Sequence, residues 1–226
     1  MHTLESSSIL RLSCELLSAH SALPVTDLVG YESLVQVILR EGLDRLDGDF
    51  LEIGCFLGGG TAKLAALAER SGKSVWVIDV FDPDFDHTRN AAGEPMAGLY
   101  SRFLGCRTQA DVFRLVTKPW ANRIHTIQQD SMKAELPAET RLAFAFVDGN
   151  HDPAWVKNDF RLVWKHLLPG GWAAFHNYAG DLPEVTATLN SLLTQYSAEI
   201  DRVERIKEKW VLLVRKRTPR TEWKKL

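Results

Sequence analysis

The sequence predicts a Rossmann-like, doubly wound α/β fold, in which helices cover both faces of a mainly parallel seven-stranded sheet. Short apolar runs rich in β-forming residues alternate with segments of helical periodicity. The apolar runs are continuous instead of alternating in polarity, which is typical of strands that are buried on both faces. No internal repeat or linker interrupts the 226 residues, so we expect a single domain over 1–226.

Composition and charge indicate a soluble protein that acts on a small molecule. The 27 Lys and Arg residues against 29 Asp and Glu residues give a net charge of −2, whereas a domain that coats nucleic acid is clearly basic. Three widely spaced cysteines, Cys14, Cys55 and Cys106, predict a reducing, cytoplasmic compartment. We expect no membrane span, because no leader-like segment and no run of roughly 18 apolar residues is present.

The first part of the chain predicts two helices followed by a strand, a turn and a helix. Apolar residues recur at helical spacing over 9–17 and 34–46, so residues 1–48 are expected to form helices that lid the ligand. A short apolar run at 49–54 ends in glycine and predicts the first strand. The segment 58–70 is rich in strong helix formers and predicts a helix directly after a glycine turn.

The middle of the chain predicts two strands separated by a long connection. A β-rich run at 74–79 and an alternating run at 123–128 predict the second and third strands. A polar loop marked by Pro and Gly extends to about Pro95, and a helix is expected over 100–116.

The last part of the chain completes the sheet. The remaining elements are predicted, in chain order, as a strand at 142–148, a helix at 154–168, a strand at 172–178, a helix at 184–195 and strands at 199–206 and 209–215. Pro169-Gly170-Gly171 ends the helix that precedes it, and the last strand is expected to be reversed. The core is therefore expected over 49–216, with a basic tail at 217–226.

A glycine-rich turn after the first strand is the first candidate binding feature. Its pattern is E-x-G-x-x-x-G-G, in which Glu52, Gly54 and Gly58 mark the fixed positions. Glycines let a ligand pass close to the backbone and let the chain turn tightly into a helix. A carboxylate at Glu52 suits a cationic amine better than a phosphate. A plain structural turn is the alternative interpretation.

Acids at the ends of the next two strands indicate a nucleoside. In open α/β sheets the ligand lies beyond the carboxyl ends of the strands. Asp79 follows Gly54 by 25 positions (79 − 54), close to the roughly 20-residue offset at which an acid binds ribose hydroxyls. Asp130 and Ser131 end the third strand, where they could bind the amino group of adenine. Solvated or helix-capping acids are the alternative.

The segments LEIGCFLGGGT, VIDVF, QDS, FVDGNH and LLPGGWAAFHNY carry a family resemblance. Over roughly Asp49 to Leu193 the chain resembles class I S-adenosylmethionine-dependent methyltransferases, and most closely the macrocin- and mycinamicin-type O-methyltransferases of antibiotic biosynthesis. The resemblance implies S-adenosylmethionine as cofactor. It implies the following cofactor-binding residues: Glu52, Gly54 and Gly58 at the methionine end, Asp79 on the ribose, Asp130 and Ser131 near the adenine, and Asp148 over the methyl group.

The resemblance also implies a catalytic set around Asp148. Asp148 and Asn177 match positions that bind Mg²⁺ in the family, although the second is commonly an acid there. An asparagine supplies an oxygen but no charge, which weakens a magnesium site. A third acid could come from the loop 82–86. His151 matches the family's proposed base, and an imidazole with a pKa near ~6.5 suits that role at neutral pH. His176 is expected behind the site.

The predicted activity is the transfer of a methyl group from S-adenosylmethionine to a hydroxyl of a small molecule, either a sugar or a natural-product intermediate. Two alternatives stay open: a metal-independent N- or C-methyltransferase or other enzyme using this cofactor, and a non-catalytic scaffold that binds the cofactor. The apolar stripes of the first two helices leave a homo-oligomer open.

The tryptophans are mostly interpreted as packing residues. Four of them are expected in the core, namely Trp76, Trp164, Trp172 and Trp210. Trp120 and Trp155 are the candidates for the border of the acceptor pocket.

Overall fold

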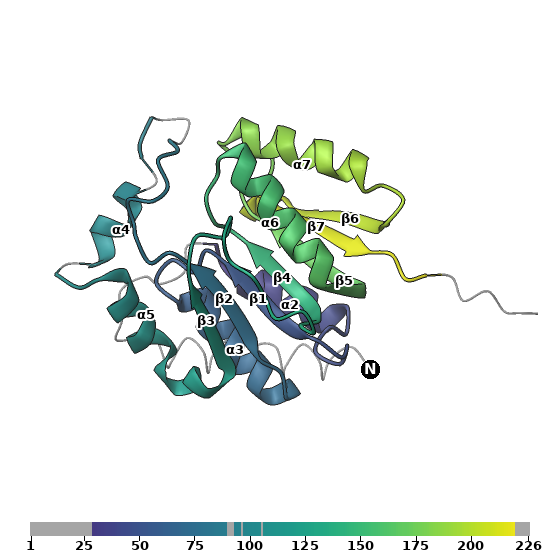
Figure 1. The fold of residues 1–226 in the computed structure, drawn as a ribbon, viewed down its shortest axis with the longest axis horizontal. Helices are drawn as coiled ribbons and strands as arrows, with labels where there is room; N and C mark the ends of the chain where they lie inside the picture. The colour runs from purple at the N-terminus through teal and green to yellow at the C-terminus, as the bar shows by residue number, and fades with distance from the viewer. Residues whose placement is uncertain (1–28, 90–92, 96, 105, 220–226) are drawn as a thin grey trace, which may run out of the picture.

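The computed structural model describes residues 29–89, 93–95, 97–104 and 106–219, which form one seven-stranded sheet with helices on both faces (Figure 1). The strand order is β3-β2-β1-β4-β5-β7-β6. The strands are β1 (Asp49–Ile53), β2 (Val75–Asp79), β3 (Ile124–Gln128), β4 (Leu142–Val147), β5 (Leu167–Phe175), β6 (Ile200–Ile206) and β7 (Val211–Lys216). Only β7 is antiparallel to its neighbours, so the predicted fold class and the reversed last strand are confirmed.

Helices cover the two faces in separate layers (Figure 1). The helices are α2 (Glu32–Arg40), α3 (Gly59–Ser71), α4 (Ala97–Leu104), α5 (Gln109–Thr117), α6 (Pro153–His166) and α7 (Pro183–Gln195), with short 3₁₀ turns η1 (Lys118–Arg123) and η2 (Lys207–Lys209). Side chains alternate across β1, so Phe50 packs with α2 and α3 whereas Leu51 packs with α6 and α7. All six residues of β4 are buried, as its continuous apolar run predicts.

Local sequence signals explain where the helices begin and end. The carboxylate of Asp152 accepts a hydrogen bond from the backbone N–H of Ala154 at the start of α6, and Pro153 follows in the first helical position. Gly72 ends α3 in the left-handed conformation, with a φ of 70°. The first signal thus marks the start of α6 and the second marks the end of α3.

Two predicted helices differ from the observed ones. The helix expected over 100–116 is divided into α4 and α5, because Thr108 accepts a hydrogen bond from the backbone N–H of Asp111 and starts a new helix. The helix expected over 34–46 ends at Arg40, and Gly42 follows with a φ of 68°. The apolar pattern continues to Leu43 because that side chain is buried outside the helix.

The predicted lid and tail are only partly within the described residues. The helix expected over 9–17 lies outside them, and α2 packs against α3. Of the basic residues near the C-terminus, Arg215 pairs with Asp201, while Lys216 and Arg217 donate hydrogen bonds to backbone carbonyls. These three cations are therefore held against the domain. In the described part of the chain, no helix has the length and apolar character needed to cross a membrane.

Candidate active site

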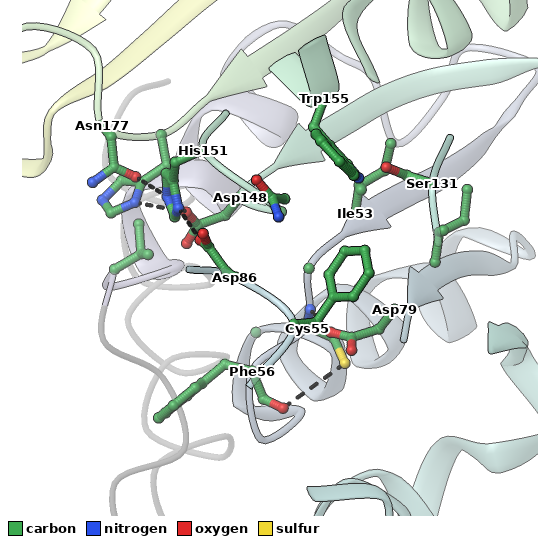
Figure 2. A pocket seen from close by; sticks show the side chains of 18 of the residues that line it. Ile53, Cys55, Phe56, Asp79, Asp86, Ser131, Asp148, His151, Trp155 and Asn177 are labelled. Carbon is green, nitrogen blue, oxygen red and sulfur yellow. Dashed lines mark hydrogen bonds and ion pairs between the residues drawn. The ribbon is translucent and has the colours of Figure 1, made fainter. Parts of the chain in front are cut away.

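A cavity of about 470 Å³ lies at the carboxyl edge of the sheet, where the strand order reverses between β1 and β4. Strand-end residues from five adjacent strands line it, namely Gly54, Asp79, Ser131, Asp148 and Asn177. The sequence predicts this convergence, because parallel strands bring their carboxyl ends to one edge. Figure 2 shows Asp148 and Asn177 on one side of the cavity, with Asp79 and Ser131 on the other.

Gly54 is required by the close approach of β1 and β4. Its φ is 80°, and a Cβ atom added to it would lie 2.1 Å from the backbone oxygen of Asp148. Both features exclude a side chain at this position. The next residues turn tightly, with Phe56 at a φ of 49° and Gly58 at 89°. This turn brings the backbone of residues 54–56 to the cavity wall.

Glu52 and Gly58, two of the predicted cofactor-binding residues, do not line the cavity. The Glu52 side chain is 0% exposed; it accepts a hydrogen bond from Tyr31 Oη at 2.5 Å and another from Thr61 Oγ1. Gly58 caps α3 and lies against Phe113. Glu52 thus ties the start of α3 and the segment before α2 to β1, and its two carboxylate oxygens have partners inside the protein.

Asp79 holds the glycine turn at the end of β2. Its Oδ2 accepts a hydrogen bond from Cys55 N at 2.8 Å, and its Oδ1 accepts one from Phe81 N at 2.7 Å. Burial raises the pKa of Asp79, although these backbone N–H groups act in the opposite direction. Burial and the nearby Asp79 also raise the pKa of the Cys55 thiol well above its usual value, so Cys55 is a packing residue here.

Asp130 and Ser131, which follow β3, have different surroundings. Ser131 lines the cavity, but Asp130 does not, because its Oδ1 accepts hydrogen bonds from Trp155 Nε1 at 2.9 Å and Met132 N at 3.0 Å. Trp155 itself lines the cavity, but it lies beside Ser131, at the end away from His151 and Asn177, and not at the end where the acceptor was expected (Figure 2). Trp120 is not among the residues that line it. Asp130 therefore orients the indole that borders this end of the cavity.

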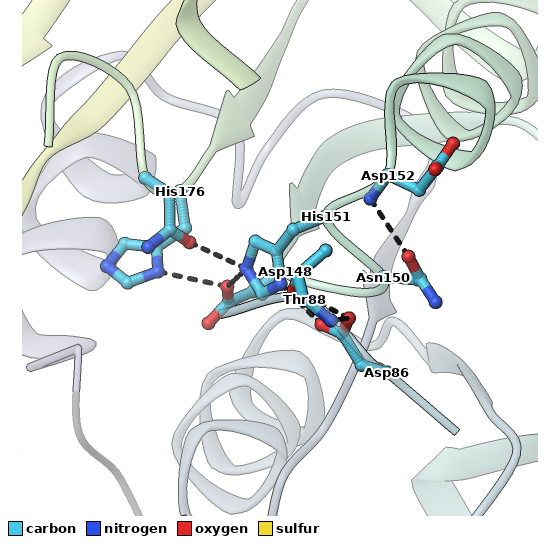
Figure 3. A network of polar contacts seen from close by, with 8 residues as sticks. Asp86, Thr88, Asp148, Asn150, His151, Asp152 and His176 are labelled. Atoms are coloured by element: carbon cyan, nitrogen blue, oxygen red, sulfur yellow. Dashed lines mark hydrogen bonds and ion pairs between the residues drawn. The ribbon is translucent and has the colours of Figure 1, made fainter. Parts of the chain in front are cut away.

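A chain of polar contacts occupies the opposite end (Figure 3). His151 Nδ1 lies 2.6 Å from Asp86 Oδ2, and His151 Nε2 lies 2.9 Å from Asn177 Oδ1 and 3.6 Å from Asp148 Oδ1. His176, which was expected behind the site, also lines the cavity, and its Nδ1 lies 2.9 Å from the same Asp148 oxygen. One carboxylate therefore stands between two imidazoles, and a second carboxylate holds the far side of His151.

These contacts determine the charges of the cluster. Burial alone lowers the pKa of His151, but the hydrogen bonds and negative charges of Asp148 and Asp86 outweigh it and raise the pKa to about 10. Burial alone would raise the pKa of Asp148, but His176 and His151 hold it well below its usual range. His151 is consequently an imidazolium at neutral pH in this arrangement, whereas a base must be neutral before it accepts a proton.

Whether these residues can bind a magnesium ion depends on which ligand atoms they supply and where those atoms point. Asp148, Asn177 and Asp86 supply oxygens of the right type. The oxygens of all three side chains face the nitrogens of His151. The imidazole ring therefore occupies the space between them that a shared cation would need. Among the residues that the structure describes, no group of three or more His, Cys, Asp or Glu side chains is arranged to hold a metal ion. The arrangement does not fit the predicted magnesium site at Asp148 and Asn177.

Two residues of the site escaped the sequence prediction. The sequence does not distinguish among the three acids of the loop 82–86. The structure shows that Asp86 is the one that contacts His151. Trp210 was expected in the core, but it is 45% exposed and lines the cavity, because it lies in the turn between β6 and β7 and not on a strand. The expected core positions of Trp164 and Trp172 are confirmed, whereas Trp76 is only partly buried.

Comparisons with solved structures agree with this architecture. The O-methyltransferase NovP is 16% identical with a TM-score of 0.60, over 81% of this chain and 76% of NovP. The calicheamicin methyltransferase CalS11 is 15% identical with a TM-score of 0.58, over 95% and 93% of the two chains. The SAH-bound methyltransferase PaMTH1 of Podospora anserina is 13% identical with a TM-score of 0.50, over 96% and 97%. At these identities the likeness establishes the fold.

Comparison at the level of sequence is more specific. No curated protein matches the chain significantly. A family model described as a methyltransferase domain matches residues 51–178, more than half of the chain, and this match runs from β1 through the polar cluster to Tyr178. The chain therefore belongs to the methyltransferase domain family.

Proposed function

We propose that this protein transfers the methyl group of S-adenosylmethionine to a hydroxyl of a small acceptor, either a sugar or a natural-product intermediate. One observation carries the proposal: a single cavity joins a nucleoside-type end, with Gly54, Asp79 and Ser131, to a buried cluster of carboxylates and imidazoles. Methyl transfer needs both, because the cofactor must be held in line with an acceptor oxygen whose proton is removed.

The residues at the nucleoside end suit S-adenosylmethionine. The backbone of Gly54 and Cys55 lines the cavity, where a ligand can approach it. Asp79 also lines the cavity, and its carboxylate has acceptor capacity for a ribose hydroxyl beyond the bonds from Cys55 N, Phe81 N and Gln109 Nε2. Ser131 and Trp155 border the position of the adenine in this proposal. The cofactor's sulfonium would then face Asp148, whose carboxylate favours a positive charge.

The chemistry is an in-line displacement. The acceptor oxygen forms a bond to the methyl carbon while the bond from that carbon to sulfur breaks, and sulfur keeps the electron pair, which yields S-adenosylhomocysteine. The hydroxyl proton goes to His151 Nε2. Because Asp86 is the partner of Nδ1, the neutral ring keeps its proton on Nδ1, and Nε2 receives the new proton once the acceptor hydroxyl has displaced its contact with Asn177 Oδ1. A positively charged cofactor beside the ring lowers the pKa of His151 and favours this neutral form.

We further propose that the transfer proceeds without magnesium. In the macrocin-type family that the sequence resembles, a cation bound at the positions of Asp148 and Asn177 would orient the acceptor. Here the His151 ring takes that place, held by Asp86, and Asn177 brings no negative charge. Because the reacting hydroxyl donates its single proton to His151 Nε2, the acceptor would be oriented by its neighbouring hydroxyls, which donate hydrogen bonds to the oxygens of Asn177 and Asp148.

The class of acceptor is supported by likeness only. One solved structure of CalS11 is named as a TDP-rhamnose 3'-O-methyltransferase, an enzyme in calicheamicin biosynthesis. A sugar hydroxyl in antibiotic biosynthesis is therefore the acceptor that we propose for this chain.

Two measurements test the proposal. Isothermal titration calorimetry should detect binding of S-adenosylhomocysteine, and absence of binding would overturn the assignment of the cofactor. Incubation with methyl-labelled S-adenosylmethionine and a library of hydroxylated metabolites should transfer label to oxygen, with equal rates in the presence and absence of EDTA. A rate that EDTA abolishes and Mg²⁺ restores would refute the metal-free step but not the methyl transfer.

A further inference from the structure

Trp210 is an exposed aromatic residue at the edge of the cavity. The exposed large hydrophobic side chains of the described residues are Leu115, Met132, Val203 and Trp210. Of these four, only Trp210 lines the cavity. A large indole that is 45% exposed at a binding site offers apolar surface that a ligand can cover.

The backbone of Trp210 is anchored beside the polar cluster. Its carbonyl oxygen accepts a hydrogen bond from Tyr178 N at 2.8 Å, and Tyr178 directly follows Asn177. The antiparallel pairing of β5 with β7 ends at Phe175 and Leu212, so Trp210 and Asn177 both lie in the turns just beyond the paired ends of these strands. The indole is therefore carried on the same sheet edge as the reacting end of the cavity.

The ring itself is held against a glycine. A Cβ atom added to Gly180 would lie 2.8 Å from Cδ2 of Trp210, so the indole rests on the bare backbone there. Trp210 also adopts a left-handed conformation, with a φ of 50° and a ψ of 36°, which costs a residue other than glycine of the order of 1 kcal/mol. A tight turn with a fixed backbone presents a preorganised platform, which lowers the entropic cost of binding.

The charge of the cavity limits what can cover that platform. Among the described residues that line it, six are acids: Asp79, Asp82, Asp86, Asp148, Asp181 and Glu208. The opposing cations in that lining are Lys209 and the imidazolium of His151, and His176, whose pKa is also raised, lies beside Asp148. The described part of the lining contains no arginine, so the acids outnumber the cations. Such a cavity opposes an anionic ligand through like-charge repulsion and admits a neutral or basic one.

We propose that Trp210 is the acceptor platform, and that the acceptor is a glycoside ring that carries no phosphate. The apolar C–H face of the ring would lie on the indole, while its hydroxyl or amino groups donate hydrogen bonds to Glu208, two positions before Trp210, and to Asp181, which follows the glycine on which the indole rests. This inference rests on the proposed function. It separates this chain from CalS11, whose named substrate bears a diphosphate.

The test uses the full chain saturated with S-adenosylhomocysteine and measures affinities by saturation-transfer difference NMR. The probes are a neutral methyl rhamnoside, the amino-glycoside tobramycin and the diphosphate sugar dTDP-rhamnose. We expect the neutral or the amino sugar, or both, to bind at least tenfold more tightly than dTDP-rhamnose. Trp210→Ala should weaken that binding at least tenfold, Trp210→Phe should retain most of it, and Leu115→Ala, an equally exposed apolar residue away from the cavity, should change nothing.

The outcomes separate this inference from the proposed function. Calorimetry with S-adenosylhomocysteine reports on the cofactor, and unchanged binding in Trp210→Ala shows that the variant is folded. If the cofactor binds but neither phosphate-free sugar does, the inference is overturned, and equal affinity for dTDP-rhamnose overturns it as well. If Trp210→Ala still binds the sugar with full affinity, Trp210 is not the platform for the acceptor. The double variant Asp181→Asn/Glu208→Gln should improve binding of dTDP-rhamnose relative to the other sugars, and no improvement contradicts the role of charge.

Discussion

Asp86 and His151 are joined by a contact of 2.6 Å between Oδ2 and Nδ1, although 65 positions separate them in the chain. Asp86 belongs to the loop after β2, and His151 follows β4. The contact therefore connects two loops on either side of the glycine turn. An imidazole held in this way has a defined proton position on Nδ1 and a defined direction for Nε2. In the proposed reaction, Asp86 would therefore act through His151.

Replacing Asp86 should move the pH dependence of the reaction to lower pH. Burial lowers the pKa of His151, but the carboxylates of Asp148 and Asp86 outweigh it and raise the pKa to about 10; the charge of His151 in turn opposes the rise in the pKa of His176, which also faces Asp148. Asp86→Asn removes one negative charge, so the pKa of His151 falls, by about 1 unit or more. The pH profile of kcat/KM for the acceptor at saturating S-adenosylmethionine, which reports on the enzyme–cofactor complex before the acceptor binds, measures this change.

Asp84→Asn is the matched control, because Asp84 is an exposed acid of the same loop that does not line the cavity. Its profile should match that of the unmodified protein. An unchanged midpoint in Asp86→Asn would show that His151 is not the group that titrates in the reaction.

The same cluster should make stability fall as pH rises above neutrality. The pKa of His151 is about 10 in the folded protein and about 6.5 in the unfolded chain, so folding is favoured by proton binding. This contribution is fully present below pH ~6.5 and is lost as pH rises through about 10. We expect the free energy of unfolding in urea to fall by a few kcal/mol more in the unmodified protein than in His151→Gln over this interval. Parallel curves for the two proteins would contradict the assignment.

The acid side has the opposite sign. The pKa of Asp148 is lowered on folding, so its stabilisation is present above about pH 3.9 and is lost as pH falls through the folded value. Asp148→Asn should therefore flatten the decline of stability below pH ~3.9. Urea titrations between pH 5 and 2 measure this, and an unaltered slope would count against the pairing with His176.

Gly54 and Gly72 form a matched pair of glycine substitutions. Both have positive φ values, 80° and 70°, but a Cβ on Gly54 meets the backbone of Asp148, whereas a Cβ on Gly72 meets nothing within 4 Å. Gly72→Ala should cost about 1 kcal/mol, the usual penalty of a left-handed conformation. Gly54→Ala should cost several kcal/mol, because β1 and β4 must separate, and it should abolish binding of S-adenosylhomocysteine. Thermal unfolding and calorimetry test both variants. If both lose the same stability, the close packing of Gly54 against the Asp148 backbone does not determine the cost.

Asp79 should be separable into a binding role and a folding role. Asp79→Asn retains one oxygen for the N–H groups of Cys55 or Phe81 but loses the negative charge, so we expect at least tenfold weaker binding of S-adenosylhomocysteine in a folded protein. Asp79→Ala leaves both N–H groups without this acceptor and should destabilise by about 1 to 3 kcal/mol for each group left unpaired. Full affinity in Asp79→Asn would show that the carboxylate does not bind the ribose.

Local patterns were sufficient for most of the fold. The apolar run of β4 and the capping residues of α6 depend on neighbours in sequence, so their positions could be predicted. The division of α4 from α5 could also have been predicted from the spacing of Thr108 and Asp111. The exposure of Trp210 could not, because the apolar strand that follows it gives it the same sequence environment as a core residue.

The sequence by itself determined the order of the strands along the chain, the residues that end them and the family pattern, because these depend on period, composition and spacing. Only the tertiary structure decided which of these residues share a cavity and what charges they carry. Glu52 and Asp130 have the expected positions at their strands. Their carboxylates, however, accept hydrogen bonds from Tyr31 and Trp155 and do not face the cavity. Asp86 looked like its neighbours in the loop until the crossing from β2 to β4 set it against His151. Charge states and metal fit follow from such long-range contacts, because they depend on distance in space and on burial.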